Sequence, residues 1–253
     1  MFLVGWIFLI FLGLLLSQEI FRRFPKFTLA FFIVLPIILI TYLIDNKIRM
    51  DWFSLTKIFS VTFAIIWFSI FRLTSFGETK FAKNGIYLIL VINIFEAIAK
   101  DVLSGGVAHY FNAAAGILSI ITLNKINSIN TTKDKNLDVN WEGMTLFWII
   151  GNTIWDWTFI YLNYPSVSAH HIAVLGAPLI IAFFNKGRWL QARVLTLGAY
   201  LFFLFLTLNS KFIPHIYSIS WGNKSFGFFL AFSSLVFMII YTIFFLRSKR
   251  ICG

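Results

Sequence analysis

Long runs of apolar residues recur along this chain, and they restrict it to folds that lipid can surround. A helix needs about 20 mostly apolar residues, within a range of about 17–25, to cross a bilayer. Runs that approach or reach this length lie at residues 2–17, 27–44, 54–73, 85–99, 107–123, 144–162, 168–184, 190–208 and 226–246. The sequence therefore predicts an all-α fold, a polytopic transmembrane helix bundle of eight or nine helices.

The choice between eight and nine helices depends on three weaker runs. The run at 2–17 is short, and those at 85–99 and 168–184 carry polar side chains. No basic segment precedes the first run and no small-residue cleavage site follows it, so we interpret it as a retained helix rather than a signal peptide. The longest polar stretch, 124–143, has the length of a loop, so we expect residues 1–253 to form a single transmembrane domain.

Composition agrees with a lipid environment. Only 12% of the residues are charged, about half the share of a soluble domain. The net charge of +11 does not indicate nucleic acid, because the basic residues form short clusters between apolar runs. Such clusters orient membrane helices and contact anionic headgroups. The lipid bilayer is therefore the expected partner, and the single cysteine, Cys252, excludes a disulfide within the chain.

The distribution of basic residues predicts the orientation. With nine helices, five clusters of three lysines or arginines fall on one side, at residues 22–26, 72–83, 125–135, 186–193 and 247–250. The other side receives Lys47, Arg49, Lys57, Lys100, Lys211 and Lys224. Cytoplasmic loops carry an excess of lysine and arginine. We therefore expect the N-terminus outside and the C-terminus in the cytoplasm.

Polar side chains inside the apolar runs mark the candidate functional region, because ionisable groups in a bilayer are costly. In the run at 85–99 and just beyond it, Asn93, Glu96 and Lys100 share one helical face. The spacing of Glu96 and Lys100 predicts an i, i+4 ion pair. The two readings are an interfacial salt bridge at a helix end and a carboxylate held in a polar cavity.

The run at 144–162 carries Asn152 and Asp156 four residues apart, and Asn163 follows it. An aspartate at this depth must find a partner or become protonated. The aromatic residues Trp155, Trp157 and Tyr161 flank it. Packing together with the interfacial aromatic belt accounts for such residues, and we favour this interpretation for Trp157. In the run at 107–123, residues 112–116 read Asn-Ala-Ala-Ala-Gly, which favours a close helix contact.

Two adjacent histidines, His170 and His171, open the run at 168–184. Neighbouring helical residues point in different directions, so one histidine at most is expected to face the core. A metal site with Asp156 and Glu96 is an alternative, but no ligand spacing such as His-x-x-x-His supports it. We predict no metal site and no catalytic residue, and the sequence does not identify a cofactor.

With the predicted orientation, these polar groups all approach the outer ends of four consecutive helices between residues 85 and 184. The economical interpretation is a polar pocket among these helices, open to the outer face and closed on the inner side by apolar residues, while the other helices serve as scaffold. The predicted binding residues are Asn93, Glu96, Lys100, Asp101, Asn112, Asn152, Trp155, Asp156, Tyr161, Asn163, His170 and His171.

The chain also resembles an uncharacterised family of bacterial polytopic membrane proteins, known only as a domain of unknown function. The resemblance covers most of the chain in order and spacing, although each motif alone is weak. The matching segments are Asn93-Ile-Phe-Glu96-Ala with Asp101, Asn112 with residues 115–118, residues 147–150, residues 155–161 with Asn163 and Pro165, and Lys186-Gly-x-Trp189-Leu190-Gln191-x-Arg193. The resemblance implies a bacterial inner (plasma) membrane location and no particular activity.

Two positions depart from the resembled pattern. Asparagine is common in the family where this chain has Asp156, which favours a hydrogen-bonding or ligand-orienting role there over a proton relay. The connection between Ser104 and His109 is shorter, so the mouth of the pocket is expected to differ.

Three functions fit these observations. A small-solute or ion transporter or channel accounts for the one-sided polar cluster, although no inverted repeat is visible in the sequence. An intramembrane enzyme acting on a lipid or isoprenoid substrate would use Glu96, Asp156 and His171 as acids or bases, but no nucleophile or diphosphate-binding motif accompanies them. A receptor-like ligand-binding membrane protein is the third. We favour transport, and the sequence leaves the ligand and the oligomeric state open.

Overall fold

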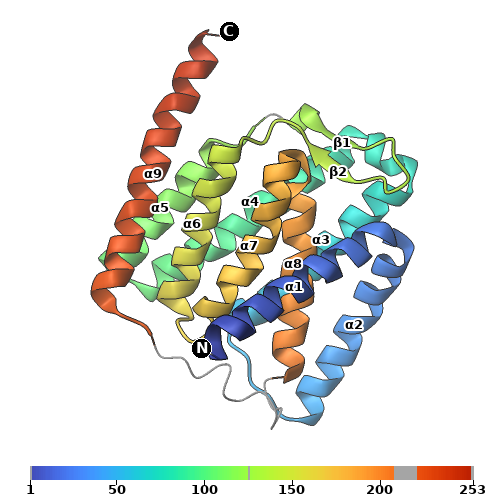
Figure 1. Cartoon of the computed structure of the whole chain (residues 1–253), viewed down its shortest axis with the longest axis horizontal. Helices are drawn as coiled ribbons and strands as arrows, with labels where there is room; N and C mark the ends of the chain where they lie inside the picture. Colours follow the sequence, from blue (N-terminus) through green and yellow to red (C-terminus); the bar gives the residue numbers. More distant parts are fainter. Residues whose placement is uncertain (1, 125, 208–220, 252–253) are drawn as a thin grey trace.

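The computed structural model describes residues 2–124, 126–207 and 221–251, and over these ranges it contains nine α-helices and one short β-hairpin (Figure 1). The helices are α1 (Phe2–Arg23), α2 (Pro25–Asp45), α3 (Trp52–Leu73), α4 (Lys80–Ser104), α5 (Val107–Ile121), α6 (Leu146–Asn163), α7 (Ser168–Phe184), α8 (Trp189–Thr207) and α9 (Lys224–Ile251). The prediction of an all-α fold is confirmed, and each predicted run corresponds to one helix. Lys125, Leu208, Lys211 and Cys252, which entered the sequence argument, lie outside the described residues.

Most helices extend beyond the apolar runs because their ends are set by capping groups rather than by hydropathy. The Asp51 side chain accepts hydrogen bonds from the backbone amides of Phe53 and Ser54 at the start of α3. Thr79 and Thr145 cap α4 and α6 in the same way. A side-chain acceptor at this position satisfies amides that have no partner within the helix.

Four helices, α1, α2, α3 and α9, are long and apolar enough to cross a membrane, and α5 and α7 are shorter apolar helices. Many large apolar side chains on the outer helices are exposed, among them Ile37 on α2 and Phe244 on α9. Exposed apolar side chains of this number are expected in lipid and not in water. The chain is therefore a multi-pass membrane protein.

Five helices form a ring at the centre of the bundle, and the other four cover it. Going round the ring, α3 packs on α4, α4 on α6, α6 on α7, α7 on α8, and α8 again on α3. The pair α5 and α9 covers α4 and α6, whereas α1 and α2 cover α3, α7 and α8. The view in Figure 1 separates these layers, with α9 at one edge and α2 at the other.

A close contact between α4, α5 and α6 forms at Gly116. A Cβ atom on this glycine would lie 2.7 Å from Ile98 Cγ1 and 2.9 Å from Trp155 Nε1. No larger residue would fit without displacing these side chains. The predicted packing role of residues 112–116 is confirmed in this respect.

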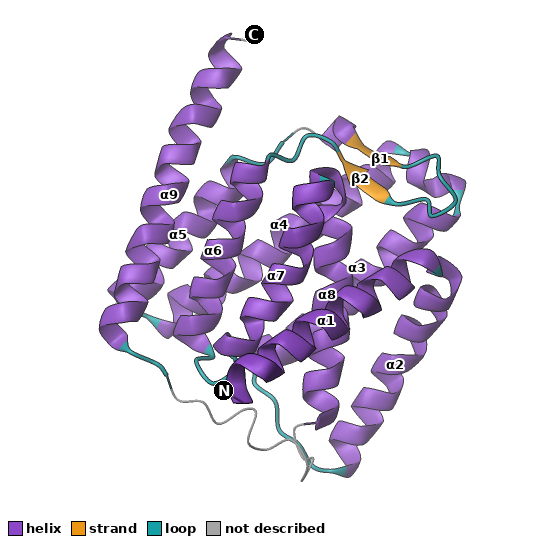
Figure 2. Cartoon of the chain, viewed as in Figure 1, coloured by secondary structure: helices purple, strands orange, loops and turns teal. Residues whose placement is uncertain are grey.

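The polar stretch between α5 and α6 is a β-hairpin, with β1 (Ile129–Thr131) antiparallel to β2 (Val139–Trp141), rather than an irregular loop (Figure 2). It lies at the end of the bundle that also holds the α1–α2, α3–α4 and α7–α8 connections. We call this end the hairpin face. The opposite end, which holds the α2–α3 and α6–α7 connections, is called the mouth face.

The buried carboxylate of Asp138 links the hairpin to the helices. The carboxylate of Asp138 contacts Arg22 Nη1 at 2.8 Å, Arg188 Nε at 3.4 Å and Gln191 Nε2 at 2.8 Å. Arg72 lies 4.0 Å away and donates hydrogen bonds to backbone carbonyls of the hairpin. These five residues, called the Asp138 cluster, join α1, α3 and α8 to the hairpin.

Candidate functional site

A cavity of about 320 Å³ lies inside the ring of five helices. This is within the size range of small-molecule sites, about 300–1,000 Å³. Its lining comes from the α2–α3 connection, α3, α4, α6, the α6–α7 connection, α7 and α8. The lining residues are Arg49, Met50, Asp51, Phe53, Ser54, Lys57, Asn93, Ala97, Trp155, Asp156, Phe159, Ile160, Tyr164, Ser166, Val167, His171, Arg193, Leu197, Leu201 and Leu204.

The floor of the cavity contains an ion pair between two ring helices. Arg193 of α8 donates through Nη2 to Asp156 Oδ2 of α6, and both side chains are largely buried. A buried charge needs a partner of opposite sign, and the expectation that Asp156 finds one is confirmed. The second terminal nitrogen of Arg193, Nη1, is buried without a hydrogen-bond partner among the described residues.

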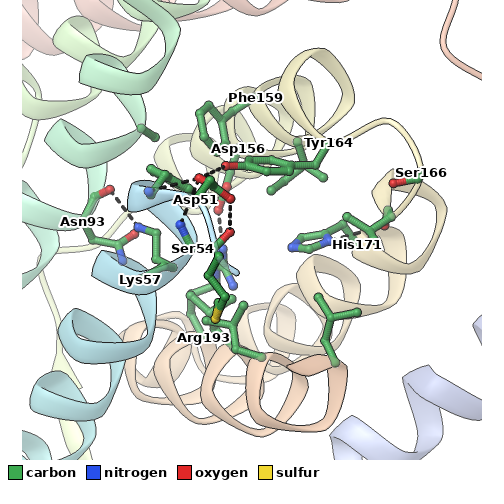
Figure 3. A pocket seen from close by; sticks show the side chains of 18 of the residues that line it. Asp51, Ser54, Lys57, Asn93, Asp156, Phe159, Tyr164, Ser166, His171 and Arg193 are labelled. Carbon is green, nitrogen blue, oxygen red and sulfur yellow. Dashed lines mark hydrogen bonds and ion pairs between the residues drawn. The ribbon is translucent and has the colours of Figure 1, made fainter. Parts of the chain in front are cut away.

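A second ion pair joins α3 to α4 beside the floor. Its lysine, Lys57, lies beside Asn93 in Figure 3. Lys57 Nζ lies 2.8 Å from Glu96 Oε2 and 3.4 Å from the backbone carbonyl of Asn93. Ser60 donates a further hydrogen bond to the same carboxylate oxygen, at 3.1 Å. The predicted Glu96–Lys100 pair is wrong, because the α3 lysine comes closer to Glu96 than the lysine one turn along α4.

The mouth of the cavity is held by Asp51. Besides capping α3, its carboxylate accepts hydrogen bonds from the Ser54 hydroxyl and, at 3.2 Å, from the Tyr164 hydroxyl. Burial raises the pKa of Asp51, but the hydrogen bonds from Ser54 and Tyr164 outweigh this effect and hold the pKa below its ordinary value. Burial and the Asp51 charge raise the pKa of Tyr164, so its hydroxyl stays protonated and donates.

Four of the predicted binding residues line this cavity: Asn93, Trp155, Asp156 and His171. The His171 ring packs edge-on against Tyr200, with ring centroids 5.1 Å apart. Trp155 donates its indole N–H to the Asn112 carbonyl at 2.9 Å, so its ring is fixed in the cavity wall.

Three other predicted residues gather in a separate network at the corner between α4 and α5. Asp101 is fully buried and accepts hydrogen bonds from Asn112 at 2.8 Å and Asn163 at 2.7 Å, and it pairs with His109 at 2.9 Å. Gly105 and Gly106, with φ of 72° and 95°, form the corner that permits this approach. None of these polar groups is among the residues that line the cavity.

The remaining predicted residues lie behind the cavity wall or at its edge. Glu96 is covered by Lys57, and Lys100 Nζ lies over the rings of Trp52 and Tyr164. Tyr161 donates to the Trp221 carbonyl at 2.7 Å, beneath α9. Asn152 and His170 are buried and are not part of the lining.

The sequence interpretation missed the contributions of α3 and α8, and their expected role as scaffold is wrong. The sequence interpretation counts Lys57 and Arg193 among the basic residues outside the membrane, on opposite sides. Both lie three positions inside the apolar runs at 54–73 and 190–208, and a cation inside such a run is the signal that identifies them. Arg49, Asp51 and Tyr164 lie between runs and carry no comparable signal.

The donor set of the described residues does not favour a metal. Within the part of the chain that the structure describes, no three side chains of histidine, cysteine, aspartate or glutamate come together closely enough to hold one. The carboxylates of the floor and the corner are instead engaged by arginine, lysine, asparagine and histidine.

Comparison with known proteins identifies the family without an activity. No curated protein and no solved structure matches the chain. A family model described as a family of unknown function (DUF5692) matches residues 1–251. Since the match covers nearly the whole length, the chain belongs to this family of unknown function, DUF5692.

Proposed function

We propose that this protein is a carrier that moves a small solute across the membrane through the cavity in its five-helix ring. The observation that carries the proposal is the position of the Arg193–Asp156 pair. It closes a ligand-sized cavity from below and belongs to two different ring helices, so a relative movement of α6 and α8 would open it.

A second, smaller cavity supports this reading. It has a volume of about 30 Å³ and is lined by residues of α3, α4 and α8, including Ala64 and Leu190, which lie closer to the hairpin face. Asn93, Arg193 and Leu197 line both cavities. These shared residues form a thin partition between the open cavity and the small one beyond it. A carrier that is open to one side is expected to have such a partition.

We place the mouth face outside the cell, following the excess of basic residues at the hairpin face. The Asp138 cluster then closes the cytoplasmic side in this conformation. It joins α1, α3 and α8 through one carboxylate, so it must rearrange for the cavity to open inward.

Reciprocal access to the cavity tests this proposal without knowledge of the solute. The variant Leu197→Cys, in a Cys252→Ser background, places a thiol at the partition. A membrane-impermeant maleimide is added to right-side-out or inverted vesicles. If the protein is a carrier, the thiol is expected to react both in right-side-out and in inverted vesicles, while the vesicles stay impermeable to the reagent. Ile65→Cys, in the fully buried core on α3, is the control and is expected to stay unlabelled.

Labelling from the mouth face alone would contradict transport and favour a receptor-like binding protein, the second candidate. The feature that favours it is that the lining residues from interhelical connections, such as Arg49, Asp51 and Ser166, all lie at the mouth face, while the floor is charged. Leakage of the reagent through the protein would instead indicate a channel.

A further inference from the structure

One face of α8 divides the cavity into a charged end and an apolar wall. Arg193, Leu197, Leu201 and Leu204 all line the cavity, and their spacing of four, four and three residues places them on one side of the helix. At about 1.5 Å per residue this stripe is about 16 Å long. Arg193 lies at the floor, and the three leucines extend from it toward the mouth.

The wall opposite α8 is also apolar between two polar ends. Phe159 and Ile160 of α6 face the cavity beside Val167, and all three are apolar. The polar side chains are concentrated at the two ends, with Asp51 and Tyr164 at the mouth. A ligand that fits this cavity has a polar head and a long apolar body.

The charges at the floor of the cavity indicate which charge the polar head of the ligand carries. At the floor, two cations, Lys57 and Arg193, line the cavity with one carboxylate, Asp156, while Arg49 and Asp51 add one charge of each sign at the mouth. Glu96, the partner of Lys57, is not among the lining residues. Arg193 Nη1 also lacks a hydrogen-bond acceptor among the described residues. A buried guanidinium nitrogen without an acceptor is costly, and a carboxylate oxygen is a strong, charge-assisted acceptor for it.

We propose that the ligand is an amphipathic monoanion, a carboxylate with an unbranched apolar chain. Its carboxylate lies at Arg193 and Lys57, and its chain lies along the leucine stripe of α8. The inference rests on the proposed function in sharing its cavity, but it concerns the chemistry of the ligand rather than its movement.

Binding of a matched series of compounds that each carry a ten-carbon chain tests this assignment. The intact protein is held in nanodiscs of zwitterionic lipid and titrated with decanoate, decanol or decyltrimethylammonium, with empty nanodiscs as the blank. Calorimetry is expected to show decanoate binding at least tenfold tighter than decanol. Butyrate, which keeps the carboxylate but cannot cover the leucines, is expected to bind at least tenfold more weakly than decanoate.

Variants locate the site. In the double variant Arg193→Gln with Asp156→Asn, both charges are removed together, so neither is left unpaired. The tenfold preference for decanoate over decanol is expected to disappear. Leu201→Phe fills the middle of the cavity and is expected to weaken decanoate and decanol alike. Arg247→Gln, an exposed arginine near the end of α9, is the charge-matched control and should leave binding unchanged.

Equal affinity for decanoate and decanol, or tighter binding of decyltrimethylammonium through Asp156, would overturn the assignment. Binding of decanoate without reciprocal labelling of Leu197→Cys would contradict transport and leave the ligand class intact. Reciprocal labelling of Leu197→Cys without decanoate binding would contradict the proposed ligand class and leave transport intact.

Discussion

At the scale of single residues, the buried Arg193–Asp156 pair is expected to have a large effect on stability. Arg193→Met leaves the Asp156 carboxylate buried without its partner, which costs about 3–5 kcal/mol. The double variant Arg193→Gln with Asp156→Asn keeps a hydrogen-bonding pair without charge and is expected to recover most of this loss. Unfolding in mixed micelles measures both. Equal stability of Arg193→Met and the wild type would show that the pair does not form.

The lowered pKa of Asp51, at the mouth of the cavity, predicts that the stability of the folded protein depends on pH. Its pKa in the folded protein is lowered, so the charged form contributes stability above the pKa of the unfolded chain, near pH 4. That contribution is lost as the pH falls through the folded pKa. Asp51→Asn keeps a helix cap but removes the charge. Its melting temperature is expected to lie below that of the wild type at neutral pH and to converge with it in acid; a constant difference would contradict this account.

The position of Asp156 in an apolar run indicates that it needs a partner, but it does not identify that partner. Arg193 is 37 positions away in sequence, and several cations would satisfy the same electrostatic requirement. The choice is made by packing, since α6 and α8 lie on the same ring. Glu96 illustrates the same limit, because the local partner Lys100 is replaced by Lys57 from α3.

At the scale of elements, the hairpin is expected to depend on Asp138. Asp138→Asn removes the charge that offsets Arg22, Arg72 and Arg188, so about 3 kcal/mol or more of stability is expected to be lost. The hairpin should also separate from the helices, which trypsin would detect as faster cleavage near Lys133. Glu142→Gln is the control, because Glu142 is exposed and pairs with none of these arginines. Equal cleavage in the two variants would contradict this role.

The elements themselves were largely predictable, because an apolar run of sufficient length in lipid must satisfy its backbone as a helix. Their ends were not, since caps such as Thr79 and Asp51 are short-range polar contacts that hydropathy does not register. The β-hairpin was missed for a related reason. Its strands are three residues long, and the contacts of Asp138 with distant helices hold them in place.

At the scale of the whole molecule, the orientation is a prediction that thiol labelling tests. In a Cys252→Ser background, Ser166→Cys at the mouth face is expected to react with an impermeant maleimide added to intact cells. Lys135→Cys at the hairpin face is expected to react only after the membrane is opened. The opposite pattern would invert the orientation and place the cavity mouth in the cytoplasm.

The arrangement of helices around the cavity was the part that sequence could not supply. A polar pocket between residues 85 and 184 was inferred from consecutive helices, yet the ring includes α3 and α8 and leaves α5 outside it. Which helices become neighbours depends on packing contacts spread along their length, such as that of Gly198 of α8 against Ile65 and Phe32. Polar residues also divide between cavity and corner, as Asp156 and Asp101 do, and nothing in their spacing separates these environments.

An experimental density map of the protein in lipid nanodiscs, at a resolution that shows side chains, tests the central claim most directly. We predict an open cavity inside the ring, with Arg193 in contact with Asp156 at its floor and the leucines of α8 along its wall. A map in which α8 packs directly against α6 with no space between them, or in which Arg193 reaches the lipid, would contradict this arrangement.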